Sequence, residues 1–294
     1  MKRLVSFILV LLALSAASQN QPIFRQWFAV QGMYNPAMVG ANEARDVSLL
    51  YRRQWVGSGV GPIGTGFFFQ HSGRHRLHYG VSVTTNESVR LRNSDGRFIL
   101  AYALPLAKKT SLRFGMSFGL ATRKLNLADD DFTNDPAVLR AADGIFGMAG
   151  SFGISLESGP LQVGFSLPAV LPQENYSPAQ LAAVGNSQLL SQWYSVRYRI
   201  RSSTGKMELD PWVVYRVLRD QRRNWEVGGL ITFNKVFSIG SGLNQGLGPS
   251  LSTGYRMKGG VQAGYTWEPG FGTGNSYGAS HEMRITIQVG SHSP

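Results

Sequence analysis

The stretch Leu112–Thr122, Leu-Arg-Phe-Gly-Met-Ser-Phe-Gly-Leu-Ala-Thr, alternates large apolar residues with small or polar ones. Successive side chains of a β-strand point to opposite faces, so the apolar residues share one face and the small or polar residues share the other. The same alternation recurs along most of the chain. This pattern is typical of a transmembrane β-barrel, which has lipid outside and a polar interior.

Working outward from this stretch, we predict an all-β fold, an antiparallel up-and-down barrel of about 14 strands, since bacterial barrels have even strand numbers. The second, eleventh and twelfth candidates alternate least clearly, which leaves a count of 12 open. The predicted strands are Arg45–Trp55, Ile63–His71, Leu77–Asn86, Arg97–Leu106, Leu112–Thr122, Met148–Glu157, Leu161–Leu167, Gln188–Arg201, Lys206–Leu218, Asn224–Phe233, Val236–Gln245, Pro249–Arg256, Gly260–Glu268 and Ser280–Val289.

The connections between these strands alternate in length. Short turns are expected at Ala107-Lys108, Ser158-Gly159, Ser202 to Gly205, Asn234-Lys235 and Met257-Lys258, and the longest loops at Lys124 to Gly147, Pro168 to Ser187 and Pro269 to Ala279. Outer-membrane barrels have short periplasmic turns and longer extracellular loops. A soluble sandwich has no reason to make every second connection short, so the alternation favours the barrel.

The composition excludes several classes of protein. With 43% hydrophobic and only 16% charged residues in 294, the chain is too apolar to be disordered. It contains no cysteine, which excludes a disulfide framework, a thiolate metal site and a catalytic thiol. The net charge of +12 comes from basic residues scattered singly between apolar ones, which disfavours nucleic acid as a partner.

The N-terminus predicts export. Lys2 and Arg3 precede an apolar run and then small residues, so residues 1–18 are expected to be a cleaved signal peptide, and the protein an outer-membrane one. Residues 19–44 lack alternation and are expected to form a plug or a periplasmic strap. Its Asn35-Pro36-Ala37 turn is expected to pack in or under the barrel mouth, anchored near Arg52 and Gln54. The barrel is assigned to residues 45–290 and a C-terminal tail to residues 291–294.

Candidate catalytic and metal sites are weak. His71-Ser72 invites comparison with outer-membrane lipid hydrolases, but adjacent strand residues point apart and no acidic residue is near in sequence. The histidines show no metal-ligand spacing on one strand face, and Asp129-Asp130-Asp131 lacks the rest of a calcium loop. We therefore expect no catalytic residue, no metal and no cofactor, and a protein that is not an enzyme.

Two further sets of residues carry expectations. A charge facing lipid costs about 2 to 4 kcal/mol at mid-membrane, so arginines within strands should face the lumen or lie at the rim. They would attract an acidic ligand or pair with Glu226 and the carboxylates of the plug, and pairing is favoured. The tryptophans lie toward strand ends and are expected to form an interfacial girdle. The arginines are Arg52, Arg197, Arg199 and Arg201, and the tryptophans are Trp55, Trp193, Trp212, Trp225 and Trp267.

Three motifs in order resemble those of one family, the PorP/SprF proteins of the type IX secretion and gliding machinery of Bacteroidetes. The first, Tyr34-Asn35-Pro36-Ala37-Met38-Val39-Gly40, resembles the family's Asn-Pro-Ala-Tyr-Ala-Gly box. The second, Tyr51-Arg52-Arg53-Gln54-Trp55-Val56-Gly57 with Gly61-Pro62, resembles its Tyr-Arg-x-Gln-Trp pattern followed by Gly-Pro. The third, Ser280-His281-Glu282-Met283, resembles its final-strand Ser-His-Glu-Ile.

The resemblance implies an outer-membrane barrel that helps particular type IX cargo, including large adhesins, to reach or stay on the cell surface. The implied partners are outer-membrane lipid, other secretion components and the exported cargo. Two departures stand out: Met38-Val39 replaces Tyr-Ala in the first box, and the chain ends Ser-His-Ser-Pro instead of on an aromatic residue. An Asn-Pro-Ala turn is also similar to the hatch of FadL-type fatty-acid transporters, which keeps transport of hydrophobic small molecules open as the alternative.

Overall fold

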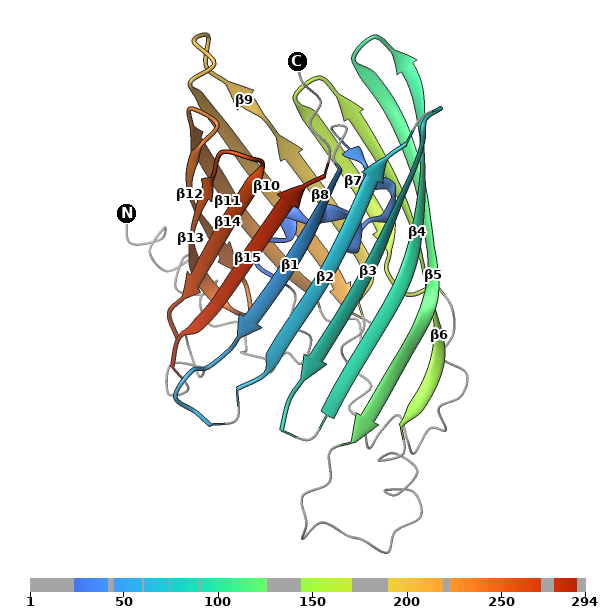
Figure 1. The fold of residues 1–294 in the computed structure, drawn as a ribbon, viewed down its shortest axis with the longest axis vertical. Helices are drawn as coiled ribbons and strands as arrows, with labels where there is room; N and C mark the ends of the chain where they lie inside the picture. Colours follow the sequence, from blue (N-terminus) through green and yellow to red (C-terminus); the bar gives the residue numbers. More distant parts are fainter. Residues whose placement is uncertain are drawn as a thin grey trace, which may run out of the picture.

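The alternation of the sequence becomes the two faces of one β-sheet that closes on itself. The computed structural model describes residues 24–41, 45–59, 61–73, 75–89, 91–125, 144–170, 190–218, 223–270 and 278–289. Its strands pair antiparallel with their sequence neighbours, and β15 returns to pair with β1 (Figure 1). In that closing pair, Val47 lies opposite Ile287 and Arg52 opposite Glu282.

The strands lie within two residues of the predicted bounds, with few exceptions. They are β1 Arg45–Arg53, β2 Ile63–Ser72, β3 Leu77–Glu87, β4 Leu91–Ala107, β5 Thr110–Leu125, β6 Ile145–Ser158, β7 Leu161–Leu167, β8 Leu190–Tyr198, β9 Ile200–Arg201, β10 Met207–Leu218, β11 Arg223–Phe233, β12 Phe237–Asn244, β13 Gly248–Arg256, β14 Val261–Glu268 and β15 Ser280–Gln288.

The wall contains 14 strands, as predicted, because β8 and β9 are two parts of one strand. Both pair with β10, and they are separated only by Arg199. The backbone N–H of Arg199 still donates to the carbonyl of Pro160, at 2.9 Å. The three weakest predicted strands all form, so the smaller count of 12 is wrong.

The outer face of the barrel is apolar and the inner face is polar. On β5, Met116 and Phe118 are more than half exposed, whereas Arg113 and Ser117, which point to the opposite face, are buried in the lumen. A soluble protein would bury such apolar side chains, so their exposure over the whole outer face matches a surface that lipid covers. Among the described residues, no helix combines the length and the apolar character that a membrane crossing needs.

The longest connections all lie at one end of the barrel, whereas every connection at the other end is short. At one end, turns of a few residues join β2 to β3, β4 to β5, β6 to β7, β9 to β10, β11 to β12 and β13 to β14. The three longest connections join β5 to β6, β7 to β8 and β14 to β15 at the other end, and most of their residues lie outside the described ranges. We call these the short-turn end and the long-loop end.

Strand β4 begins six residues before its predicted start at Arg97. The added segment, Leu91–Gly96, is mostly polar but still pairs with β3 and β5 on both sides. Such a segment lacks apolar alternation because strands that extend beyond the bilayer need no lipid-facing side chains. Backbone pairing alone keeps it in the sheet.

Candidate functional site

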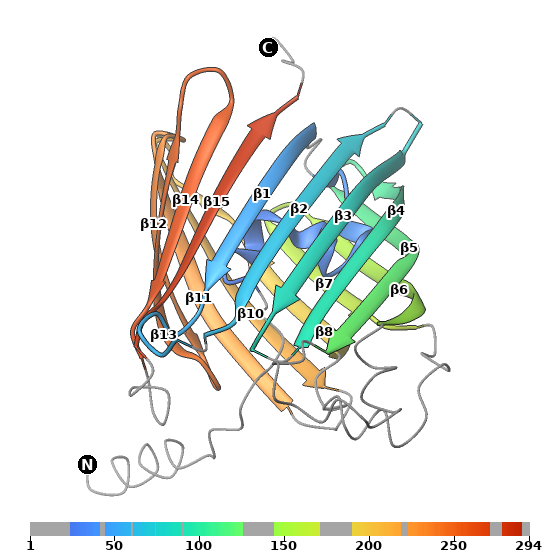
Figure 2. The ribbon, with the colours of Figure 1, turned by 60° about the horizontal axis from the view of Figure 1, so that its bottom comes forward.

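Residues 24–41 lie inside the barrel and are called the plug below. They form three 3₁₀ turns, η1 Trp27–Ala29, η2 Gln31–Met33 and η3 Pro36–Met38, seen as the blue segment inside the wall (Figure 2). Two groups of contacts, on different strands, make the main attachments of the plug to the wall, and single bonds from Arg197 and Arg284 reach its Phe28 and Gln26. Each of the two groups contains residues of the motifs singled out in the sequence.

The first attachment is built around Asn35. The residue before proline is restricted to extended conformations, and Asn35 has φ −128° and ψ 106°, which turns the chain into η3. Its side-chain oxygen caps η3 by accepting from the N–H of Ala37, at 3.0 Å. Its side-chain nitrogen donates to the carbonyls of Ile154 and Phe165, at 3.1 and 3.3 Å. Both functions together require an amide, since a carboxylate would have no donor for the two carbonyls.

The wall beneath this turn is made of glycines, which we call the glycine cradle. Gly115, Gly153 and Gly164 come from β5, β6 and β7. A Cβ on Gly115 would lie 2.2 Å from the backbone of Pro36 and Ala37, and one on Gly153 would lie 2.0 Å from the Asn35 side chain. The face of Leu112–Thr122 that carries small residues, Gly115 among them, therefore also leaves room for the plug.

Hydrogen bonds hold the end of η3 in the cradle. The Arg113 guanidinium donates to the carbonyls of Ala37 and Val39, at 2.8 and 2.6 Å. The chain then turns at Gly40, which has φ +66° and whose N–H donates to the side chain of Gln70 at 3.1 Å. A side chain at Gly40 would meet both backbone strain and the ring of His78, 2.8 Å from a Cβ.

The second attachment is a buried group of charges, which we call the ion cluster. The carboxylate of Glu282 accepts from the backbone N–H groups of Arg25 and Gln26, at 2.6 and 2.8 Å. Arg52 bridges from Glu282, at 3.3 Å, to Glu268. Two of the three sequence motifs thus supply residues of the ion cluster, Arg52 from the second and Glu282 from the third, and Glu282 binds the plug directly.

Arg25 of the plug extends the ion cluster across the lumen. Its guanidinium contacts Glu268 at 2.6 Å and Glu226 at 3.0 Å, and Glu226 also contacts Arg216 at 2.9 Å. The six side chains, Arg25, Arg52, Arg216, Glu226, Glu268 and Glu282, are each at least 95% buried. Three positive and three negative charges balance, which offsets the cost of taking each one out of water.

Aromatic side chains fill the space between the two attachments. Trp27 of the plug packs edge-on against Trp193 and Trp212, with ring centroids 5.5 and 6.0 Å apart, and Tyr34 stacks on Trp193. The expectation that Trp193 and Trp212 belong to the interfacial girdle is therefore wrong, since both face the lumen and are almost fully buried. Trp225, by contrast, faces outward and is 38% exposed.

Burial raises the pKa of the Tyr34 hydroxyl, which accepts from the N–H of Phe24.

The remaining motif residues divide between the two faces. Gln54 and Pro62 are buried and joined by a 2.9 Å backbone bond, and Trp55 lies at a positive φ of 52° in the loop after β1. Tyr51 faces outward, and His281 pairs on the outer side with the Tyr265 hydroxyl at 2.6 Å. The direct polar contacts of the Asn35-Pro36-Ala37 turn are to the cradle strands and Arg113, whereas the sequence placed its anchor near Arg52 and Gln54.

Three arginines follow one another along β8 and β9 and pair with carboxylates of the neighbouring strand β10. They are Arg197 on β8, Arg199 between the two strands and Arg201 on β9. Arg197 contacts Asp210, Arg199 lies 3.3 Å from Glu208, and Arg201 lies 2.7 Å from Glu208. These arginines thus pair with carboxylates, as predicted, but the carboxylates are not the predicted ones. Glu226 belongs to the ion cluster, and Glu43, the carboxylate of the predicted plug segment, lies outside the described residues.

Ser72 has a histidine neighbour, but not the one beside it in sequence. Its hydroxyl lies 3.2 Å from Nδ1 of His78 across the β2–β3 pair, while His71 points outward and stacks on Tyr79. Gly40 of the plug lies directly on the His78 ring. Ser72 and His78 are both buried, and the plug lies against the histidine ring.

Sequence reasoning missed Arg25, Arg113, Arg216 and Glu268. Arg113 was placed on the polar face of its strand, but its partners are carbonyls 74 and 76 residues away. Strand parity would have assigned Trp193 to the lumen, because it lies two residues before Ser195 and four before Arg197 on the same face.

Comparisons with solved structures agree with the barrel fold. The chain resembles the outer membrane protein Omp33 of Acinetobacter baumannii, with 8% identity, a TM-score of 0.51 and coverage of 84% of this chain and 99% of that one. A FadL homologue of Pseudomonas aeruginosa gives 10% identity, a TM-score of 0.53 and coverage of 93% and 95%. These likenesses concern the fold alone.

Comparison with the curated proteins gave no significant match. The family model described as type IX secretion system membrane protein PorP/SprF matches residues 16–287, a range that includes the plug, the glycine cradle and the ion cluster. The chain belongs to the PorP/SprF family of type IX secretion system membrane proteins.

Proposed function

We propose that this protein is a non-enzymatic outer-membrane accessory of the type IX secretion system. It assists the secretion or surface attachment of specific cargo proteins, such as the adhesins used in gliding. The short-turn end faces the periplasm and the long loops face the exterior. The observation that carries the proposal is the family match over nearly the whole chain, motif residues included.

The plugged lumen supports a role in contacts between proteins. The plug is bound to the wall by the ion cluster on one side and the glycine cradle on another. Such an interior suits a barrel that works through its two ends, where other secretion components and the exported cargo would bind. The predicted signal peptide of residues 1–18 would direct the chain to the outer membrane.

Transport of hydrophobic small molecules is the competing function. The fold likeness to a FadL homologue keeps it open, but the apolar part of the lumen is already filled by the plug. Phe24, Val30 and Val39 of the plug pack on Phe68 and Ile99 of the wall. The other lumen-facing side chains of the strands are largely polar, which suits a hydrophobic ligand poorly.

Deletion of the gene tests the proposal. The expected result is that general secretion continues while one adhesin-like protein disappears from the cell surface, as measured by surface proteomics, and that the wild-type gene restores it. An unchanged surface proteome would contradict the accessory role. A defect in long-chain fatty-acid uptake, with normal surface proteins, would favour the transporter.

A further inference from the structure

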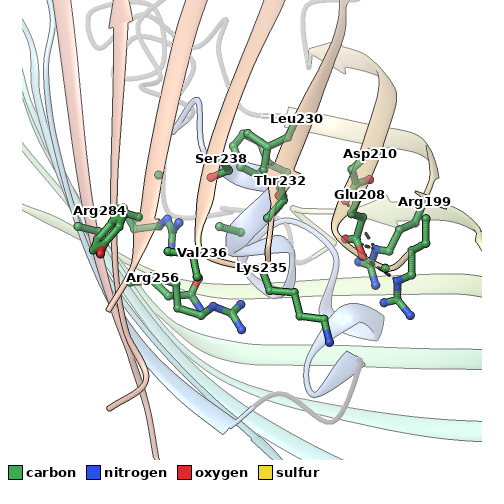
Figure 3. A pocket seen from close by; sticks show the side chains of 18 of the residues that line it. Arg199, Glu208, Asp210, Leu230, Thr232, Lys235, Val236, Ser238, Arg256 and Arg284 are labelled. Carbon is green, nitrogen blue, oxygen red and sulfur yellow. Dashed lines mark hydrogen bonds and ion pairs between the residues drawn. The ribbon is translucent and has the colours of Figure 1, made fainter. Parts of the chain in front are cut away.

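The lumen contains a cavity of about 720 Å³ between the plug and the short-turn end (Figure 3). Phe28 and Ala29 of the plug line its inner side, and residues of the β9–β10 and β11–β12 turns line its outer side. A second cavity of about 410 Å³ lies beside the β6–β7 turn and shares Arg197, Arg199 and Arg201 with the first. We call the two cavities together the vestibule.

The vestibule is strongly basic; its smaller cavity adds Lys109 and one carboxylate, Glu157, to the charges of the larger one. Six cationic side chains line the larger cavity, against the carboxylates of Glu208 and Asp210 alone; they are Arg197, Arg199, Arg201, Lys235, Arg256 and Arg284. The two carboxylates pair with the arginines of β8 and β9. Among the residues that the structure describes, no carboxylate lies within ion-pair distance of Lys235 or Arg256, both of which are exposed to the cavity.

The cations are spread too widely for one small anion. Arg201 is on β9 and Arg256 is on β13, and β10, β11 and β12 lie between them in the sheet. Four strand spacings correspond to about 19 Å along the wall. In Figure 3, Arg199, Lys235 and Arg256 come from separate parts of the wall, with Lys235 between the other two. An extended peptide of roughly six residues spans such a distance, at about 3.3 Å per residue.

We propose that the vestibule binds an acidic segment of a partner protein that enters the barrel from its short-turn end. Guanidinium groups bind carboxylates with paired hydrogen bonds, and arginine clusters are a recurring means of recognising acidic motifs. The plug closes the inner side of the cavity, so the bound segment is a chain end or a loop and does not pass through. Lys108, Lys206 and Lys258 on neighbouring turns add positive charge at the rim, which attracts the same partner before it binds.

This inference rests on the proposed function only in that the short-turn end faces the periplasm, where the partner would meet it. The binding reaction itself is tested on the purified full chain in detergent. The probe is a fluorescein-labelled ten-residue peptide of alternating Glu and Ser, and its Gln/Ser counterpart is the uncharged control. Binding is measured by fluorescence anisotropy at two salt concentrations.

The variant Lys235→Gln/Arg256→Gln removes two charges from the vestibule. The matched control, Lys206→Gln/Lys258→Gln, removes two charges from the same rim but from outside the cavity. The acidic peptide is expected to bind wild-type protein, and the vestibule variant to weaken binding at least tenfold, with less than a twofold effect of the control. Heat-modifiable mobility on gels verifies that both variants are folded.

Three results would overturn the proposal. Equal losses in the two variants would mean that the rim attracts anions without a site, and equal binding of the Gln/Ser peptide would remove the role of acidic side chains. Displacement of the peptide by millimolar inorganic phosphate at constant ionic strength would indicate a small-anion site instead. Higher salt is expected to weaken binding, because exposed charges are screened.

Failure of this inference can be distinguished from failure of the proposed function. If the peptide does not bind but the gene deletion still strips a cargo protein from the surface, the vestibule is not the partner site and the accessory role stands. If the vestibule variant loses peptide binding but the deletion leaves the surface proteome unchanged, the site stands and the accessory role fails.

Discussion

Replacing Glu282 by glutamine removes one negative charge from the ion cluster without changing the size of the side chain. In the wild type, this carboxylate accepts from the backbone N–H groups of Arg25 and Gln26 and lies 3.3 Å from the Arg52 guanidinium. The variant leaves three arginines against two glutamates in a region without water access. Breaking a buried ion pair on one side costs about 3–5 kcal/mol, because the remaining charge is buried without compensation.

The plug is expected to open more often by the corresponding factor. Since 1.4 kcal/mol is a tenfold change, amide hydrogen exchange of residues 24–41 should be roughly 10²- to 10⁴-fold faster in Glu282→Gln than in the wild type. Exchange is measured by mass spectrometry on the protein in detergent micelles. The barrel strands should keep their protection, because their backbone bonds do not involve the cluster.

Glu208→Gln is the matched control. Glu208 also faces the lumen and contacts two arginines, but its side chain is 30% exposed and its partners Arg199 and Arg201 are 25% and 67% exposed. Pairs of this kind contribute only about 0–1 kcal/mol, so plug exchange should change less than roughly fivefold.

A second substitution separates charge balance from packing. Arg52→Gln combined with Glu282→Gln restores equal numbers of positive and negative charges in the cluster. The double variant should therefore be less destabilised than the sum of the two single variants. Strictly additive effects, or equal effects of Glu282→Gln and Glu208→Gln, would refute the idea that buried charges hold the plug.

The remaining predictions concern the cradle and the outer face. Asn35→Asp removes the donors to the two carbonyls of β6 and β7, which should cost about 1–3 kcal/mol per unpaired group and speed exchange of residues 35–41. Gly115→Ala places a Cβ 2.2 Å from plug backbone and should lower the thermal unfolding temperature, with a cost of about 1–3 kcal/mol, whereas Gly96→Ala, with no atom within 4 Å, should not. Brominated lipids should quench the fluorescence of Trp225 but not that of Trp193; equal quenching would contradict the assignment of faces.

The wall was predictable because one face of each strand contacts lipid and the other faces the lumen. Lipid selects large apolar side chains on one face of every span, so the period of two survives in the sequence of each strand separately. The prediction of strand bounds failed in a segment that has no lipid-facing side chains. The polar start of β4 lies in a part of the strand without apolar alternation, and its pairing is visible only through β3 and β5.

The interior was less predictable because its contacts join distant parts of the chain. The hydrogen bond between the Arg25 N–H and Glu282 joins residues 257 apart in sequence, so no local sequence pattern predicts it. The family motifs identified Arg52 and Glu282, but not that Glu282 binds the plug or that Arg52 pairs with Glu282 and Glu268. Trp193 and Trp212 were assigned from their positions along the strands, although the strand parity of Trp193 already pointed to the lumen.

The central claim is that an N-terminal plug, held by the ion cluster and the glycine cradle, closes the lumen. Conductance in planar lipid bilayers tests it most directly. The wild-type protein should show no steady channel current, and a variant lacking residues 24–41, or carrying Arg25→Gln with Glu282→Gln, should show stable or flickering channel openings. A steady, pore-like current through the wild-type protein, unchanged in these variants, would contradict the account.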